Sequence, residues 1–153
     1  MRLSYQSSKS IKDFIKNNKQ VTVIDHHVTA QESAKLTQDY LFDLDHSGAV
    51  LAWQYFHPKK PVPQFLKHVE DVDLWNFKLA NSREIMTYVD TFDFTFPIWN
   101  KLVREVEDKD SRKDYIEKGK VIWQSQEKVI KKIIDSNAYL VDFEGHQPLI
   151  INA

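Results

Sequence analysis

The segment VTVIDHHVTA, residues 21–30, places an acid and two histidines directly after a short apolar run. The β-branched residues before the acid predict a buried strand. Side chains at the carboxyl end of a parallel strand project into the crevice where α/β proteins bind ligands. Imidazole together with carboxylate suits ions such as Mn, Fe, Zn or Co. The segment therefore predicts one strand of an α/β fold, with a candidate metal site at its end.

The three polar residues of this segment are expected to take different roles. Neighbouring residues at a strand end point in alternate directions, so we expect one of His26 and His27 to bind a metal while the other faces a substrate. Asp25 would then orient an imidazole and fix its tautomer. The alternative interpretation is a partly buried histidine pair in a turn, with Asp25 as a helix cap.

Strands and helices alternate in the first third of the chain. The pattern predicts helices at residues 10–19, 29–38 and 47–56, and strands at residues 20–25 and 40–45. Thr29 and Glu32 have the spacing of a capping box for the second helix. Ser47 is expected as the N-cap of the third helix. Four residues of that helix are expected to pack inward: Ala49, Ala52, Trp53 and Phe56. The alternation favours an α/β fold with a partial parallel sheet and crossover helices.

The second half of the chain is expected to be mostly helical. A short helix that runs into an acidic segment is predicted within residues 64–77, and further helices are predicted at residues 82–92, 97–108 and 111–136. The tail contains two apolar segments around Gly145, which predict a C-terminal β-hairpin. We expect residues 1–110 to form a partial α/β domain. Residues 111–153 would then be a long connecting helix and the start of a small C-terminal domain.

Composition excludes several classes of site. The 153 residues carry a net charge of −1 and no cysteine, so thiolate metal sites and disulfides are ruled out. Three glycines, none of them clustered, exclude a Walker loop and a dinucleotide-binding fingerprint. No apolar run is long enough to span a bilayer, and the start lacks the apolar core of a signal peptide. We therefore expect a cytoplasmic protein without a membrane partner.

The remaining aromatic and histidine residues have ordinary structural explanations. Large rings dominate core burial, so the four tryptophans are expected to be core or helix-packing residues: Trp53, Trp75, Trp99 and Trp123. His46 lies beside a predicted helix start and is expected in a solvated loop rather than in a ligand site. The other three histidines are expected at the surface: His57, His68 and His146.

Three stretches together resemble the DHH phosphoesterase superfamily. VTVIDHHVTAQE, residues 21–32, is similar to the signature motif of that family. DHSGAVLAWQYF, residues 45–56, resembles the helix that follows the motif. VEDVDLWNF, residues 69–77, is similar to the acidic motif of the branch related to exopolyphosphatases and oligoribonucleases. The order and spacing of the three stretches fit from about residue 20 to residue 80, and more loosely to the end.

The resemblance implies a hydrolase that uses two divalent ions, usually manganese, on phosphodiester or phosphoanhydride bonds. Its substrate would be a phosphorylated small molecule or a short oligonucleotide. By position, His26 would be a metal ligand supported by Asp25, and His27 would contact the substrate phosphate or the leaving oxygen. The later carboxylate ligand would be Asp71, with Asp73 as the alternative. Two further residues would either offer backbone N–H groups to phosphate or serve as a plain helix cap: Ser47 and Gly48.

The sequence departs from the family pattern before the triplet Asp25-His26-His27. In the family, an early strand carries a histidine and two aspartates, and a later strand carries another aspartate; none of these precedes Asp25 here. We therefore expect the chain to be truncated at both ends, with PLIINA resembling the start of the small C-terminal domain.

Three interpretations remain open. The chain is a fragment or subunit of a metallophosphoesterase that another polypeptide completes, a non-catalytic relative that binds a phosphorylated ligand or a protein partner, or an unrelated α/β interaction domain. An incomplete sheet has an open edge, so we expect a homo-oligomer or a complex with a chain that supplies the missing half. The contact would involve the N-terminal helix and the strand edge at residues 21–25.

Overall fold

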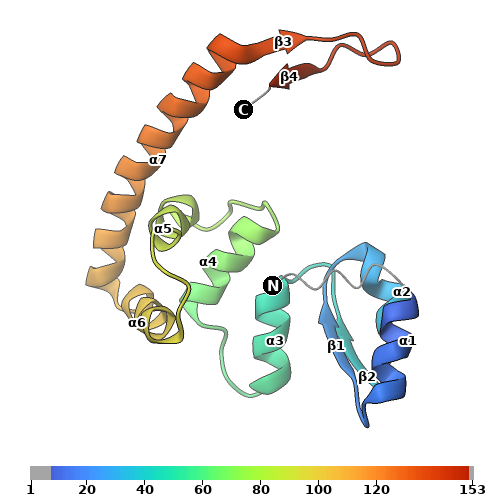
Figure 1. Cartoon of the computed structure of the whole chain (residues 1–153). Coiled ribbons are helices and arrows are strands. Elements are labelled where there is room, and N and C mark those ends of the chain that lie inside the picture. The colour runs from blue at the N-terminus through green and yellow to red at the C-terminus, as the bar shows by residue number, and fades with distance from the viewer. Residues whose placement is uncertain (1–7, 152–153) are drawn as a thin grey trace.

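The computed structural model describes residues 8–151 and shows a mixed α/β fold (Figure 1). In chain order the elements are α1 (Ser8–Asn17), β1 (Thr22–Asp25), the 3-10 helix η1 (Val28–Ala30), α2 (Gln31–Ala34), β2 (Asp39–Phe42), α3 (Gly48–Phe56), α4 (Gln64–Asp73), α5 (Ser82–Val89), α6 (Phe96–Glu107), α7 (Lys109–Asn137), β3 (Ala138–Leu140) and β4 (Leu149–Ile151). The expected fold class is confirmed: a short parallel sheet with crossover helices, a long helix and a C-terminal hairpin.

The parallel sheet consists of β1 and β2, paired from Thr22 with Asp39 to Asp25 with Phe42. One face of the sheet is covered by α1 and α2, where Val23 packs against Ile11 and Ala34. The other face is covered by α3 (Figure 1). Helices therefore lie against both faces of the sheet, and Val23 is the buried residue of β1.

The main hydrophobic core lies among α4, α5, α6 and α7. Its buried members are Phe65, Ile85, Val89, Leu102, Val106 and Tyr115. Helices α5 and α7 approach very closely at Gly119, where an added Cβ would lie 1.8 Å from the carbonyl oxygen of Glu84. Only glycine fits at this crossing, so the position fixes how α7 packs on α5.

The second half of α7 extends away from the other helices and carries the β3–β4 hairpin at its far end (Figure 1). Val129 and Ile130 on this half are exposed, although their spacing is that of a buried face. The hairpin turns at Gly145, whose φ of 80° is in the left-handed region. The long helix and the hairpin are confirmed, whereas the division into two domains stays a prediction.

Two predictions about the start of the chain are wrong. Thr29 lies in η1 rather than at a helix start, and α2 begins after Ala30 without a side-chain cap. The helix also ends at Ala34 rather than near residue 38. The hydroxyl of Thr37 lies 2.7 Å from the carbonyl oxygen of Ala34 and 2.9 Å from that of Asp39. This contact turns the chain directly into β2, which leaves no room for a longer helix.

Three predictions about side-chain positions also need correction. In α3 the fully buried residues are Val50 and Leu51, while Phe56 is exposed, because α3 contacts α4 as well as the sheet. Trp75 is not a core residue, since 78% of its surface is exposed. His68 is buried rather than at the surface, because its side of α4 faces α5. Among the helices described, none is long and apolar enough to cross a membrane.

Candidate functional site

The end of β1 is organised by the carboxylate of Asp25. One oxygen, Oδ1, accepts the backbone N–H of His26 at 2.7 Å and that of His27 at 2.9 Å, and it also lies 2.8 Å from Nδ1 of His27. Partial burial favours the neutral acid, but the hydrogen bonds from His27 and His26 outweigh it, and the pKa of Asp25 is lowered. Asp25 therefore holds His26 through the backbone N–H of His26, whereas it contacts the ring of His27 directly.

The ring of His26 faces α4, where Nε2 lies 3.6 Å from Oδ2 of Asp73. The side chain of His26 is 14% exposed and that of Asp73 is 42% exposed. The first turn of α3 also lies against the ring, since a Cβ on Gly48 would lie 3.8 Å from Cδ2 of His26. Three elements, β1, α3 and α4, therefore meet at His26.

His27 points away from this junction. Its side chain is 69% exposed, and its ring makes an edge contact with that of His26 at 4.2 Å between centroids. The two histidines thus have the different environments expected of neighbours at a strand end. His26 is held inside the junction, and His27 is open to a ligand.

Asp71, the first choice for the later carboxylate ligand, has a structural role. Its buried carboxylate accepts the backbone N–H groups of Lys78 at 2.8 Å and Leu79 at 3.1 Å. Burial alone would raise the pKa of Asp71, but hydrogen bonds from Ser82 and from these two backbone N–H groups lower it. Asp71 therefore closes the loop after α4, and the alternative residue Asp73 is the one that faces His26.

Glu70, which the sequence analysis did not single out, lies at the N-terminus of α3. Its Oε2 accepts the backbone N–H of Ser47 at 2.8 Å and lies 3.1 Å from Nδ1 of His46. The hydroxyl of Ser47 accepts the N–H of Val50 at 3.2 Å, so the predicted N-cap is confirmed. A carboxylate at this end of a helix interacts favourably with the helix dipole.

Glu70 changes the expectation for the phosphate-binding residues. Two alternatives were open for Ser47, a phosphate contact or a plain helix cap, and the protein supplies its own carboxylate to the backbone N–H of Ser47. His46 is likewise partly buried against Glu70 instead of being fully solvated in a loop. Glu70 and Asp73 are three residues apart on α4, a spacing that places both acids on one face of a helix. The sequence alone contains this spacing and could have indicated that both residues belong to the site.

The junction thus combines imidazole and carboxylate groups, but its metal-binding capacity is limited. Within residues 8–151, no three histidine, aspartate or glutamate side chains converge closely enough to hold a metal ion. His26 and Asp73 are a two-ligand arrangement, whereas protein metal sites of this kind usually take three or more protein ligands. Any complete site needs donors beyond those the described residues bring together.

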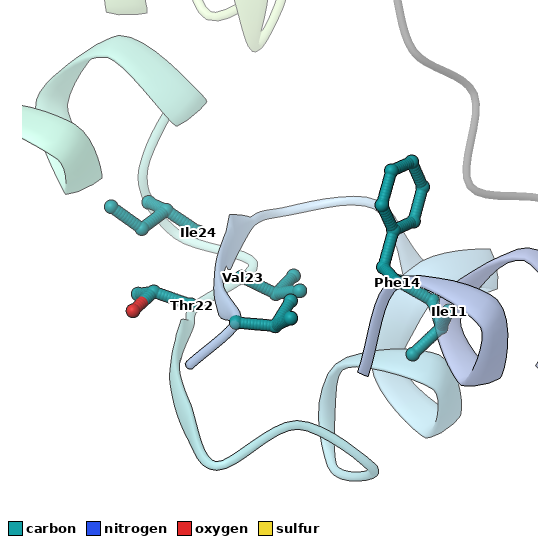
Figure 2. Close-up of a pocket in the computed structure, with 6 residues that line it drawn as sticks. Ile11, Phe14, Thr22, Val23 and Ile24 are labelled. Carbon is teal, nitrogen blue, oxygen red and sulfur yellow. The ribbon is translucent and has the colours of Figure 1, made fainter. Parts of the chain in front are cut away.

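A pocket of about 310 Å³ lies apart from the triplet, along β1 and beside α1 (Figure 2). It is lined by Ile11, Phe14, Val21, Thr22, Val23 and Ile24. In the described part of the chain, β1 pairs with β2 alone, so its other edge has no strand partner. The pocket and the open edge thus lie along the same strand that ends at the junction.

Comparisons with known proteins assign no activity. No model of a known family matches the chain, and no solved structure matches it. The chain is similar to an uncharacterized protein of Acanthamoeba polyphaga mimivirus, with 36% identity over 122 residues. The matched region is 78% of this chain and 28% of the viral protein, so the chain spans less than a third of that relative.

Proposed function

We propose that the chain supplies part of a divalent-metal site that hydrolyses phosphodiester or phosphoanhydride bonds, as the resemblance to DHH phosphoesterases implies. The observation that carries the proposal is the approach of His26 to Asp73. Two ligand atoms that each lie about 2.1 Å from one ion are at most about 4.2 Å apart. The 3.6 Å between Nε2 and Oδ2 is within that span, so both side chains can bind the same ion without a backbone movement.

Each residue of the triplet then has a definite task. His26 and Asp73 hold a manganese or similar ion, which activates water and neutralises charge on the phosphoryl oxygens when bound. Asp25 fixes the backbone of both histidines, which keeps Nε2 of His26 directed at α4. His27 is exposed, and with its Nδ1 held against Asp25 its ring can hydrogen-bond to the substrate phosphate.

The remaining ligands come, in this proposal, from a strand that adds to the open edge of β1. An acidic residue at the end of such a strand would lie beside Asp25, because the carboxyl ends of parallel strands meet at one edge of a sheet. The pocket lined by Val21 and Phe14 gives the added segment a surface to bury. The donor is a partner chain or a second copy of this chain, and the cytoplasm remains the expected compartment.

A second function is a non-catalytic protein that binds a phosphorylated ligand or a protein partner. The contact between Glu70 and Ser47 favours the protein-binding form of this function, since a carboxylate occupies the N-terminus of α3 where a phosphate would bind. The two functions differ in their response to manganese. Only the metal-dependent site loses its affinity for the ion when His26 or Asp73 is replaced.

Hydrolysis of bis(4-nitrophenyl) phosphate with added Mn²⁺ tests the proposed ligand count. The chain by itself is expected to show little turnover, because it contributes only two of the necessary ligands. Turnover should appear when the partner is present and should be lost in His26→Ala and Asp73→Asn. Full activity of the chain alone would show that the ligand count is wrong. Activity retained in both variants would overturn the site assignment.

A further inference from the structure

The connection between α5 and α6 exposes two large aromatic side chains. Its sequence TFDFTFP, residues 91–97, carries an aromatic ring at every second position. Phe92 packs against the main core, whereas Phe94 is 86% exposed and Phe96 is 87% exposed. This connection lies apart from the β1–β2 sheet (Figure 1), so neither the proposed metal site nor the open edge of β1 accounts for the exposed rings.

The exposed rings are part of a larger aromatic cluster. The ring of Phe94 lies against that of Trp99, with 4.4 Å between centroids and 51° between planes. Trp99 in turn meets the buried ring of Phe65, at 5.6 Å between centroids. The row of rings therefore leads from the solvent into the core. We call Phe94, Phe96 and Trp99 the aromatic surface, and exposed apolar patches of this kind mark interaction sites.

Backbone hydrogen bonds hold the aromatic surface in place. The N–H of Phe92 donates to the carbonyl oxygen of Val89 at 3.1 Å, which ties the connection to the end of α5. The N–H of Thr95 donates to the carbonyl oxygen of Asp93 at 2.9 Å. The N–H of Trp99 donates to the carbonyl oxygen of Thr95 at 2.9 Å, which fixes the first turn of α6. An ordered segment loses less conformational entropy on binding than a mobile one.

The charge beside the aromatic surface is negative. Asp90 and Asp93 are both exposed, and neither has an ion-pair partner within residues 8–151. Lys101, the next cation along the chain, pairs with Glu105 at 3.6 Å. Uncompensated carboxylates repel the phosphates of nucleic acids and of anionic lipids. The electrostatic complement of this surface is therefore lysine or arginine on a protein.

Trp99 also carries a hydrogen-bond donor that lacks an acceptor. Its Nε1 is buried, and no described residue accepts its hydrogen. An unpaired buried donor is destabilising, so an acceptor supplied from outside would contribute to binding. The neighbouring ring of Phe94 is almost fully exposed and can move aside without leaving the core. A backbone carbonyl of a bound peptide could then reach the indole N–H.

We propose that the aromatic surface binds a segment of another protein that carries apolar side chains next to lysine or arginine. Aromatic anchors contribute most of the binding energy at protein interfaces, and the apolar side chains of the partner would cover Phe94 and Phe96. The basic residues of the partner would meet Asp90 and Asp93. The partner is a different chain, because a second copy of this chain is expected at the edge of β1. The inference does not depend on the metal site.

Selection of peptides from a random phage-displayed library on the full chain tests this proposal. The enriched sequences should combine aromatic or aliphatic residues with lysine or arginine. A synthetic peptide of the enriched sequence should bind Phe94→Ser and Phe96→Ser about 10-fold more weakly than the wild type, as for the loss of an interface anchor. Asp93→Asn should weaken binding less and reduce its dependence on salt. Phe143→Ser, which removes an exposed ring on the C-terminal hairpin, is the matched control and should bind like the wild type.

Several results would overturn the inference. The first is a selection that enriches no sequence, or only acidic or uncharged ones. The second is unchanged peptide affinity in Phe94→Ser and Phe96→Ser, provided that their thermal midpoints show that both variants are folded. Cosedimentation of the wild type, but not of Phe94→Ser, with phosphatidylcholine vesicles would assign the surface to lipid. A lower mass of Phe94→Ser than of the wild type in light scattering would assign it to a second copy of the chain.

Discussion

Nε2 of His26 and Oδ2 of Asp73 lie 3.6 Å apart, and this contact joins the end of the parallel sheet to the helical half of the chain. The contact is a tertiary one, because His26 follows β1 and Asp73 is the last residue of α4. The contact depends on α3, which packs against both β1 and α4. The packing of α3 therefore decides whether a metal site can form.

The contact of Glu70 with the N-terminus of α3 predicts a measurable contribution to stability. Glu70→Ala leaves the backbone N–H of Ser47 without its partner, and we expect a loss of about 1–3 kcal/mol in the free energy of unfolding. Glu70→Gln keeps an acceptor oxygen and should lose less, about 0.3–1 kcal/mol, because only the charge at the helix end disappears. Urea denaturation measures both, with the exposed Glu127→Gln on α7 as the control. Equal losses in the alanine and glutamine variants would show that the hydrogen bond to Ser47 contributes nothing.

Gly119 predicts a strict requirement for glycine. An added Cβ would meet the backbone of Glu84 at 1.8 Å, so Gly119→Ala must push α5 and α7 apart. We expect a loss of about 3 kcal/mol in the free energy of unfolding, at the upper end of the usual cost of overpacking. Ser125→Ala, on an exposed turn of the same helix, is the control and should be nearly neutral. A neutral Gly119→Ala would mean that α5 and α7 do not cross as described.

His68 predicts a loss of stability in mild acid. Burial and then the nearby charge of Arg112 lower the pKa of His68, against weaker opposing effects of Asp71 and Glu107. Below about pH 6.5 the unfolded chain protonates this histidine while the folded chain keeps it neutral, so the unfolded state binds more protons. The contribution of His68 to the free energy of unfolding should therefore be fully present above that pH and should decrease as the pH drops below it.

The contribution of His68 can be isolated by comparing variants. The decrease in thermal midpoint between pH 7 and pH 5.5 should be smaller in His68→Gln than in the wild type. His146→Gln, at the exposed hairpin turn, should leave the decrease unchanged. An unchanged pH dependence in His68→Gln would show that folding does not lower the pKa of His68.

The open edge of β1 predicts association through the surface beside α1. Phe14 is 42% exposed and lines the pocket along β1 (Figure 2), so Phe14→Glu places a charge where a partner strand would pack. In light scattering at micromolar concentration, the wild type should exceed the monomer mass and Phe14→Glu should return to it. Phe96→Glu, an equally drastic change far from β1, should leave the mass unchanged. A monomeric wild type in the absence of a partner chain would rule out self-association.

The helices and strands follow from local patterns in the sequence, and most are where the periodicity predicts them. The failures are places where a tertiary contact decided the outcome. A turn around Thr37 ends the helix that the capping box at Thr29 predicted, and Phe56 is exposed on α3. A periodic pattern shows that a helix has an apolar face, but it does not show which neighbour that face meets.

In the candidate site, too, tertiary contacts decide what the sequence leaves open. The carboxylates of Glu70, Asp71 and Asp73 lie within one turn of α4, and the sequence alone does not distinguish them. Their roles follow from the direction in which each points. Glu70 reaches the start of α3, Asp71 closes the loop after α4, and Asp73 reaches His26. Helix periodicity turns each carboxylate in a different direction, and the packing of α3 and α5 against α4 decides what each one meets.

Manganese-induced line broadening in the NMR spectrum of the ¹⁵N-labelled full chain tests the proposed metal site most directly. The account predicts that substoichiometric Mn²⁺ broadens the amide signals of His26, Gly48 and Asp73 first. The effect should disappear in His26→Ala and in Asp73→Asn, and it should persist in the matched surface variants His146→Ala and Asp142→Asn. Broadening centred elsewhere, or unchanged broadening in His26→Ala and Asp73→Asn, would contradict the account.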